Sequence, residues 1–304
     1  MHIPVLLHET IQGLAPEKGD TALDGTAGAG GHASALCDAI GSTGTLIALD
    51  EDMRAVERTK ERLKDCTATT HVIQKNFRDL GDALNDLGIT QVNRILFDLG
   101  VSSFQLDGEG LPAGQAGRGF SFKRDEPLEM TLRDSPGEET LTAYEMVNEW
   151  EEEHLADIIF GYGEERYSRK IAASICRARE GAPIKTTFAL VEAIRNGVPA
   201  RYANGRGIHF ATRTFQAIRI AVNDELRALE QGLAEGWKHL TPQGRIAVIS
   251  FHSLEDRIVK RFFKEREREG TAQLITKKPI EAGESERKEN PRARSAKLRI
   301  AEKM

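Results

Sequence analysis

A glycine-rich stretch and the acidic residues around it are the part of this 304-residue chain best suited to chemistry. Residues 24–33 read DGTAGAGGHA, and Gly28 to Ala33 satisfies the dinucleotide-binding pattern G-x-G-x-x-G/A. Asp50 follows at the end of a later apolar run, where a carboxylate can accept hydrogen bonds from both hydroxyls of an adenosine ribose. NAD and S-adenosylmethionine both present an adenosine, so these features suit them equally. A glycine turn that binds no ligand is the third interpretation.

Asp24, directly before the loop, distinguishes between NAD and S-adenosylmethionine as candidate ligands. A pyrophosphate held there would meet a carboxylate in a low-dielectric crevice, which is unfavourable. S-adenosylmethionine has no phosphate and carries a sulfonium and an ammonium, which are both cationic. Asp98, in LFDLGVSSFQ, is expected to face the same crevice. The charges therefore favour the methyl donor, unless Asp24 simply caps the turn.

Alternating strands and helices are expected to position these groups. Apolar runs at 21–24, 44–50, 70–76 and 93–100 predict strands, with helices between them, the first over 31–40. Such runs between helices are typical of buried parallel strands, so the sequence predicts a doubly wound α/β sheet.

The C-terminal part is expected to complete this sheet. Strands are predicted at 244–251 and in AQLITKK and AKLRIAE, after a long helix over 212–240. Ser253 is expected to cap the next helix, with Asp256 completing a capping box.

The strand pattern breaks after Ser103. A glycine-rich segment and three helical stretches follow, and no strand is predicted until about residue 210. We therefore predict an inserted all-helical subdomain over 106–209, and a sheet domain built from 1–105 and 210–304.

Charge is unevenly distributed along the chain. The net charge of −5 by itself argues against nucleic acid, but residues 193–223 hold five arginines and no acid. Residues 257–304 hold 15 Lys and Arg against 8 Asp and Glu, a net of +7, whereas 125–165 hold 14 acids against one arginine. Two basic segments can bind RNA locally, although charge runs often only keep a face solvated.

Cellular location is inferred from what the sequence lacks. No apolar run reaches the roughly 18 residues of a membrane span, and the N-terminus lacks the features of a signal peptide. Cys37, Cys66 and Cys176 are scattered and odd in number, so we expect neither a disulfide framework nor a metal site. The prediction is a cytoplasmic protein with no membrane or metal partner.

Several longer blocks carry a family resemblance: HIPVLLHE, DGTAGAGGHAS, FDLGVSSFQLD, RGFSF, TRTFQAIRIAVNDEL, ISFHSLEDRIVKRFF and NPRARSAKLR. They resemble the MraW-like bacterial 16S rRNA cytosine-N4 methyltransferase family and run from residue 2 to about 300. The resemblance implies a Rossmann-like class I methyltransferase sheet with a helical insertion that recognises substrate. It implies S-adenosylmethionine as cofactor and small-subunit rRNA as partner, within a small-subunit particle.

The resemblance also implies the donor-binding residues, which are Gly30, Gly31, His32, Asp50, Phe77, Asp98 and Gln105. Two of them have simpler interpretations. Phe77 could be plain core packing, and His32 could be a helix-start residue that touches solvent.

The cytosine amine is a poor nucleophile because its lone pair is delocalised into the ring. Catalysis is therefore expected to need a group that accepts a hydrogen bond from the amine. The Asp/Asn/Ser-Pro-Pro-aromatic motif of related amino-methyltransferases is absent, and Asp98 occupies its first position. We hypothesise that Asp98, a backbone carbonyl beside it or the Ser102 hydroxyl accepts the hydrogen bond from the amine.

Basic residues are expected to hold the RNA phosphates. The candidates are Arg201, Arg206, Arg213, Arg292, Arg294, Lys297 and Arg299, together with His252, for which helix capping is the alternative. The chain departs from the family at Phe104, in the glycine-rich loop 108–117 and at LEMTL, which bears on entry of the target base.

Three other functions remain open at this point. The first is a nicotinamide-dependent oxidoreductase, and the second is a non-catalytic RNA-binding assembly factor. The third is a methyltransferase that acts on another nucleic acid or on protein. The sequence leaves the oligomeric state open, a homodimer included.

Overall fold

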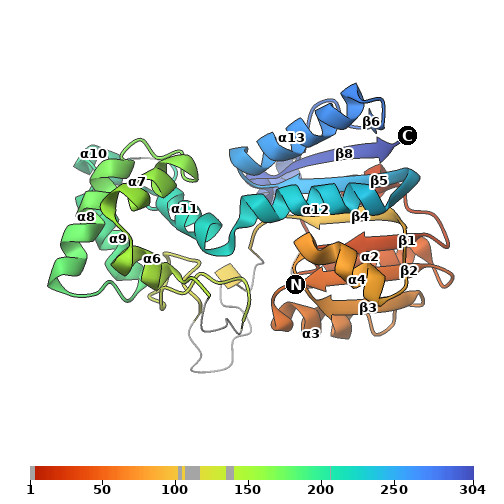
Figure 1. Cartoon of the computed structure of the whole chain (residues 1–304), viewed down its shortest axis with the longest axis horizontal. Coiled ribbons are helices and arrows are strands. Elements are labelled where there is room, and N and C mark those ends of the chain that lie inside the picture. The colour runs from red at the N-terminus through yellow and green to blue at the C-terminus, as the bar shows by residue number, and fades with distance from the viewer. Residues whose placement is uncertain (1–3, 102–104, 107–116, 135–139, 206) are drawn as a thin grey trace. The chain divides into compact units, whose positions relative to one another are not determined.

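The structure is a computed structural model that describes residues 4–101, 105–106, 117–134, 140–205 and 207–304. It divides into two compact units. The sheet unit comprises residues 1–100 and 226–304, and the helical unit comprises residues 101–225 (Figure 1).

The sheet unit is built on one eight-stranded sheet with the order β3-β2-β1-β4-β5-β8-β6, in which β7 also pairs with β8. The first five strands are parallel, and β8 is antiparallel to β5, β6 and β7. The predicted doubly wound α/β sheet and its strands are therefore confirmed. The strands are β1 Thr21–Asp24, β2 Thr45–Asp50, β3 Thr69–Gln74, β4 Val92–Asp98, β5 Leu240–Ser250, β6 Ala272–Leu274, β7 Ile280–Glu281 and β8 Lys297–Lys303.

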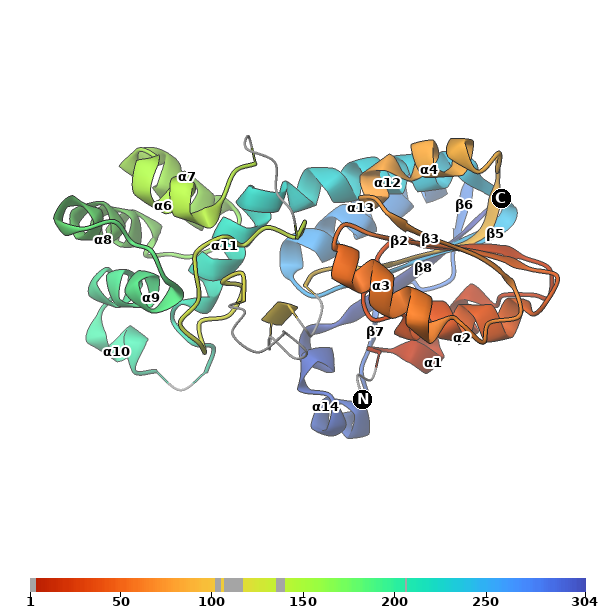
Figure 2. The same cartoon turned by 90° about the horizontal axis from the view of Figure 1, so that it is seen from below.

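Helices cover both faces of this sheet (Figures 1 and 2). One face carries α4 Leu80–Asp86, α12 Glu225–His239 and α13 Ser253–Arg268, and the other carries α1 Leu7–Leu14, α2 Gly31–Ile40 and α3 Met53–Arg62. Successive strand residues point to opposite faces. Accordingly, Leu23 of β1 packs in the first layer and Ala22 packs in the second.

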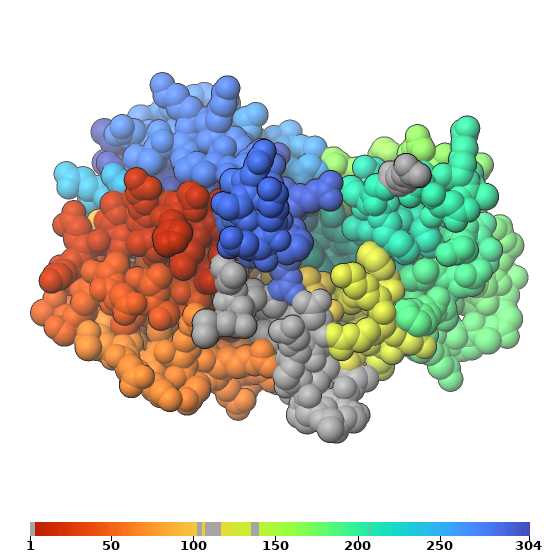
Figure 3. All heavy atoms as spheres, turned by 180° about the vertical axis from the view of Figure 1, so that it is seen from behind, coloured from red at the N-terminus to blue at the C-terminus, as the bar shows by residue number. Residues whose placement is uncertain are grey.

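The first described residues lie against the C-terminal segment that carries α14 Glu284–Glu289. The Leu6 N–H donates a hydrogen bond to Glu286 Oε1 at 2.7 Å. Figure 3 shows this segment, in blue, beside the N-terminal residues, in red. The contact holds residues 4–6 on the sheet unit, and these residues matter for the site described below.

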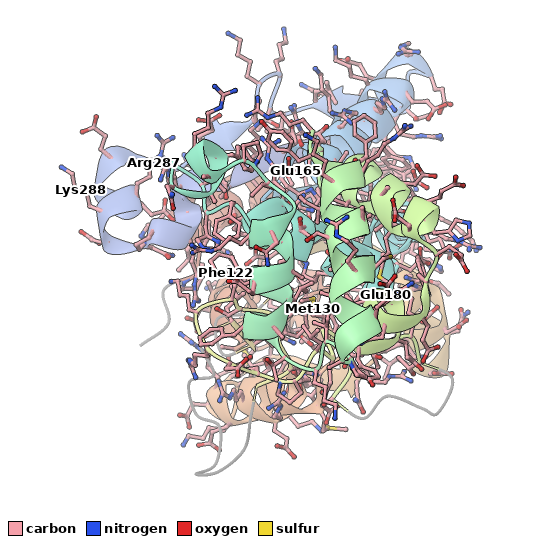
Figure 4. The ribbon with its side chains drawn as sticks, turned by 90° about the vertical axis from the view of Figure 1, so that its left-hand side faces the viewer. Phe122, Met130, Glu165, Glu180, Arg287 and Lys288 are labelled. Carbon is pink, nitrogen blue, oxygen red and sulfur yellow. A yellow bond between two sulfur atoms is a disulfide. The ribbon has the colours of Figure 1, made fainter. Side chains whose placement is uncertain are left out.

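The helical unit has its own hydrophobic core, which includes Met130, Met146, Ile159 and Phe215. Figure 4 looks onto this unit. Its helices are α6 Ala143–Glu149, α7 Glu152–Gly161, α8 Ser168–Gly181, α9 Thr187–Asn196, α10 Ala200–Ala203 and α11 Thr212–Asn223.

The long helix predicted over 212–240 is wrong. The chain breaks at Asp224, whose φ of 49° lies in the left-handed region, and this break separates α11 from α12. The helical unit comprises residues 101–225, whereas the predicted insertion spans 106–209. It extends past residue 209 because α11 packs against α6 and α7.

Two of the three cysteines are paired. Cys37 of α2 and Cys66, just after α3, form a disulfide, and Cys176 is a free thiol. The expectation that the cysteines form no disulfide framework is therefore wrong for Cys37 and Cys66, and the cysteines no longer support a cytoplasmic location. Among the described residues, no helix is both long and apolar enough to span a membrane.

Candidate functional site

Three aspartates meet at one edge of the sheet. Asp24, Asp50 and Asp98 end the adjacent strands β1, β2 and β4. Asp24 is in register with Ala48 and with Leu96, so Asp50 and Asp98 each extend two residues beyond it. The strand order reverses at β1, and ligands of doubly wound sheets bind at the carboxyl edge beside such a point.

The glycine loop closes over this edge. Gly28 and Gly30 have φ angles of 56° and 74°, in the left-handed region where a side chain is disfavoured. Gly30 is the N-cap of α2. The Gly28 N–H donates to Asp50 Oδ2 at 2.8 Å, which ties the loop to the end of β2.

Thr26 joins the other two acids. Its N–H donates to Asp24 Oδ1 at 3.1 Å, and its Oγ1 accepts the Asp98 N–H at 2.6 Å. The loop and the ends of three strands therefore form one hydrogen-bonded cluster.

Burial changes the charge behaviour of these acids. Burial of its carboxyl group raises the pKa of Asp24 to about 6, and burial likewise raises the pKa of Asp50 to about 7. Asp24 Oδ2 and Asp98 Oδ1 are buried and have no hydrogen-bond partner among the described residues. Leaving such an oxygen unpaired is unfavourable, so the pair suits a ligand that brings N–H donors or positive charge.

His32 is buried within this cluster and is only 5% exposed, so it is not a solvent-facing residue at the helix start. Its Nε2 lies 3.0 Å from the Val5 carbonyl oxygen, and its Nδ1 lies 3.4 Å from Asp98 Oδ2. Burial lowers the pKa of His32, but the hydrogen bond and charge of Asp98, the charge of Asp24 and the hydrogen bond with Val5 together outweigh it, so the net shift is upward. With an acceptor at each nitrogen, the ring is best satisfied as an imidazolium that donates to both.

Close packing fixes the loop. A Cβ on Gly25 would lie 2.5 Å from the Phe97 ring, and one on Gly31 would collide with Pro4. The Phe77 ring packs on Phe97 with centroids 5.0 Å apart, and Phe77 is partly buried against the core. Its contact with an adenine stays a prediction.

Other predicted site residues belong to the helical unit or lie outside the described residues. Gln105 is buried in the helical unit, and its role in donor binding stays a prediction. Ser102, Phe104, Arg206 and nearly all of the loop 108–117 lie outside the described residues.

The side chains predicted to contact phosphates differ in their exposure and in the partners that they already have. Arg201, Arg213 and Arg294 are exposed, although Arg213 also donates to the Glu164 carbonyl at 2.6 Å. Arg299 is only 8% exposed and holds both carboxylate oxygens of Asp256, at 2.7 and 3.2 Å. We therefore leave Arg299 out of the RNA surface proposed below.

Lys297 and Arg292, the other two candidates near the C-terminus, are partly buried, and so is His252. Lys297 Nζ lies 3.7 Å from Asp256 Oδ2, and Arg292 is half-buried. RNA binding by Lys297, Arg292 and His252 stays a prediction, as it does for Arg201, Arg213 and Arg294.

His252 caps α13. Its Nδ1 accepts the Glu255 N–H at 3.4 Å, and Glu255 Oε2 accepts the His252 N–H at 3.2 Å. The predicted capping box, with Ser253 and Asp256, is therefore displaced by one residue.

Several residues that support the site were missed from the sequence. They are Val5 and Thr26, described above, Thr59, whose Oγ1 donates to the Gly28 carbonyl at 3.3 Å, and Asp52, whose N–H donates to Asp50 Oδ1 at 2.9 Å. Both Val5 and Thr26 lie inside blocks that carried the family resemblance, which is the signal that could have found them.

The residues present fit S-adenosylmethionine. Asp50 can still accept ribose hydroxyls, because each carboxylate oxygen has a second lone pair. Asp24 and Asp98 offer unpaired acceptors to cationic groups. Fold and site together define a Rossmann-like methyltransferase with S-adenosylmethionine as methyl donor.

The particular family follows from comparison with known proteins. Residues 1–304 match the MraW methylase family, to which the chain belongs. It is 48% identical over 304 residues to the ribosomal RNA small subunit methyltransferase H of Deinococcus radiodurans, covering 99% of this chain and 89% of that protein. It is 43% identical over 319 residues to the Brevibacillus brevis protein of the same name, covering 100% and 98%. The predicted family resemblance is confirmed.

Solved structures are more distant. An rRNA methylase from Streptococcus thermophilus is 11% identical with a TM-score of 0.46, covering 100% of this chain and 99% of that one. An S-adenosylmethionine-dependent O-methyltransferase from Thermotoga maritima is 10% identical with a TM-score of 0.42, covering 100% and 68%. At these scores we base no conclusion on either.

Proposed function

We propose that this protein transfers a methyl group from S-adenosylmethionine to the exocyclic N4 amine of one cytosine in the decoding region of small-subunit rRNA. The rRNA part is supported by its relatives, which are named as small-subunit rRNA methyltransferases. The observation that carries the amine part is Asp98, which ends β4 with Oδ1 buried and unpaired and Oδ2 facing His32.

The chain's own groups hold the donor and the acceptor. Gly30, Gly31 and Asp50 bind the donor, and Asp24 offers a carboxylate to its positive charge. When bound, the donor supplies an electrophilic methyl on a sulfonium. Most of the rate enhancement then comes from holding that methyl and the amine close and aligned.

Asp98 assists the amine. A carboxylate oxygen that accepts a hydrogen bond from the amine N–H increases the electron density on nitrogen and can receive the proton after transfer. The ionised carboxylate is the form that accepts, and His32 Nδ1, 3.4 Å from Asp98 Oδ2, faces the other oxygen of the same group. The Ser102 hydroxyl remains an alternative acceptor.

The target base must be unstacked or already single-stranded to reach the donor. We assign substrate recognition to the helical unit and phosphate contacts to Arg201, Arg213, Arg292, Arg294 and Lys297. The substrate is the rRNA in a small-subunit particle, and the site of action is the cytoplasm.

The test uses purified protein, S-adenosylmethionine with a deuterated methyl group, and small-subunit particles from cells lacking this gene. Digestion to nucleosides and mass spectrometry should find deuterated N4-methylcytidine. Deuterated 5-methylcytidine, or a methylated ribosomal protein, would refute the proposed substrate atom. Absence of any transfer, with RNA binding intact, would favour the assembly factor. Tight binding of NADH without binding of S-adenosylmethionine would favour the oxidoreductase.

A further inference from the structure

The helical unit has a pocket of about 340 Å³ where α7 ends and α8 begins. This is at the small end of the roughly 300–1,000 Å³ typical of ligand pockets. All of its lining residues belong to the helical unit: Ala156, Asp157, Phe160, Arg166, Tyr167, Ser168, Arg169 and Lys170. None of them was among the predicted site residues.

The pocket is basic within an acidic neighbourhood. It is lined by Arg166, Arg169 and Lys170, all exposed, against the single acid Asp157. None of these three cations forms an ion pair with a described residue, whereas Arg219 in the same unit is paired with Glu225 at 2.7 Å. Residues 125–165, which lead into the pocket, hold 14 acids and one arginine. The pocket lining itself, with three cations against one acid, therefore suits an anion, in contrast to the segment before it.

An aromatic ring stands beside these cations. Phe160 is 64% exposed, which leaves its ring available for stacking. The Arg166 guanidinium is held over the rings of Tyr167 and Tyr202, at 4.8 and 5.2 Å from their centroids. The Tyr202 hydroxyl donates to the buried carboxylate of Glu165 at 2.6 Å, so one cation of the pocket has a fixed support.

We propose that this pocket binds a single-stranded segment of the substrate RNA, with one base stacked on Phe160 and neighbouring phosphates on Arg166, Arg169 and Lys170. Exposed rings next to unpaired cations are the composition of sites that hold single strands. The inference rests on the proposed RNA substrate, and it adds a second contact surface to the basic residues assigned above. It predicts that the enzyme binds RNA beyond the target base.

Matched variants test the pocket. Phe160→Ala and the double variant Arg169→Ala/Lys170→Ala are compared with Phe188→Ala and Arg177→Ala/Lys185→Ala, which remove exposed side chains of the same kinds elsewhere in the helical unit. The probe is a single-stranded RNA oligonucleotide that contains the target cytosine, titrated at several salt concentrations. Melting temperatures confirm that each variant is folded.

Phe160→Ala should raise the Kd about 5- to 100-fold and leave the salt slope unchanged, because it removes base stacking. Arg169→Ala/Lys170→Ala should reduce the magnitude of the slope of log K against log salt by about 1.4, at about 0.7 per phosphate contact. The controls should bind as the wild type does. Wild-type binding by the pocket variants, or equal losses in the controls, would overturn the proposal. So would a loss seen only with the assembled particle, because that pattern indicates a protein partner.

Nucleoside analysis with the same proteins separates this proposal from the proposed function. If the wild type forms no N4-methylcytidine but the pocket variants still lose RNA affinity, the function fails and the pocket stands. If the wild type forms N4-methylcytidine and the pocket variants bind normally, the pocket fails and the function stands.

Discussion

His32 Nδ1 lies 3.4 Å from Asp98 Oδ2, so a histidine in the first turn of α2 contacts the carboxylate that ends β4. The other ring nitrogen of His32 faces the Val5 carbonyl. A buried histidine thus connects the N-terminal segment to the residue that we assign to the reacting amine.

Asp98→Asn should lower kcat about 10²-fold at saturating donor, because an amide oxygen is a weaker acceptor than a carboxylate and cannot take the proton. Donor affinity is measured separately, by calorimetry, so that weaker donor binding is not mistaken for slower chemistry. A normal turnover rate at saturating donor would contradict the role of Asp98.

His32 should carry protons on both ring nitrogens at pH 7 in the folded protein. Nitrogen NMR of the imidazole reads this directly, and a neutral ring protonated only at Nε2 would contradict it. His32→Gln should lower the free energy of unfolding by about 1–3 kcal/mol, because it leaves a partly buried carboxylate without its cation. It should also lower kcat more than it raises the Kd for the donor, since His32 acts through Asp98.

Donor affinity should depend on pH through Asp24 and Asp50. Their pKa values are raised to about 6 and about 7, so in the donor-free protein both take up protons as the pH falls through this range. A cationic ligand prefers the ionised carboxylates, so affinity should be highest above pH 7. It should fall by about tenfold per pH unit for each group once the pH is below that group's pKa.

The free energy of unfolding of the donor-free protein should change with pH in the opposite direction to donor affinity. Both groups hold protons more tightly in the folded state than in the unfolded state, so their contribution to donor-free stability is greatest at low pH and declines as the pH rises from about 4 to 7.

Calorimetric titrations of the donor from pH 5.5 to 8 check the predicted pH dependence of donor affinity. S-adenosylhomocysteine, which lacks the sulfonium charge, should show a weaker pH dependence. Equal profiles for the two ligands would count against the electrostatic argument.

Substitution of Arg299 should lower stability, whereas substitution of Arg294 should reduce the salt dependence of RNA binding. Arg299→Met breaks a largely buried ion pair with Asp256 and should lower the free energy of unfolding by about 1–3 kcal/mol. Arg294→Met removes an exposed cation, so it should leave stability within about 0.5 kcal/mol and reduce the magnitude of the RNA salt slope by about 0.7–0.9. Chemical denaturation and salt-dependent RNA titration measure the two effects. The reverse pattern would mean that Arg299, not Arg294, contacts RNA.

Local patterns predicted the sheet and the loop well. Short apolar runs and the glycine spacing depend on nearby residues, so β1, β2 and the start of α2 at Gly31 were found from the sequence. The acidic edge followed because parallel strands bring their carboxyl ends together.

Contacts between distant residues were not predictable in the same way. The Val5–His32 hydrogen bond joins residues 27 positions apart, and the Cys37–Cys66 disulfide joins residues 29 apart, so neither leaves a local pattern. In HSLED, His252 with Glu255 and Ser253 with Asp256 are overlapping capping patterns that differ by one residue, and spacing alone does not choose between them. Asp224 breaks a helical pattern without glycine or proline.

The central claim is tested most directly by mapping N4-methylcytidine in small-subunit rRNA from cells with and without this gene. The account predicts that deletion removes this modification from one cytosine of the decoding region, and that wild-type protein restores it whereas Asp98→Asn does not. An unchanged modification map after deletion would contradict the account.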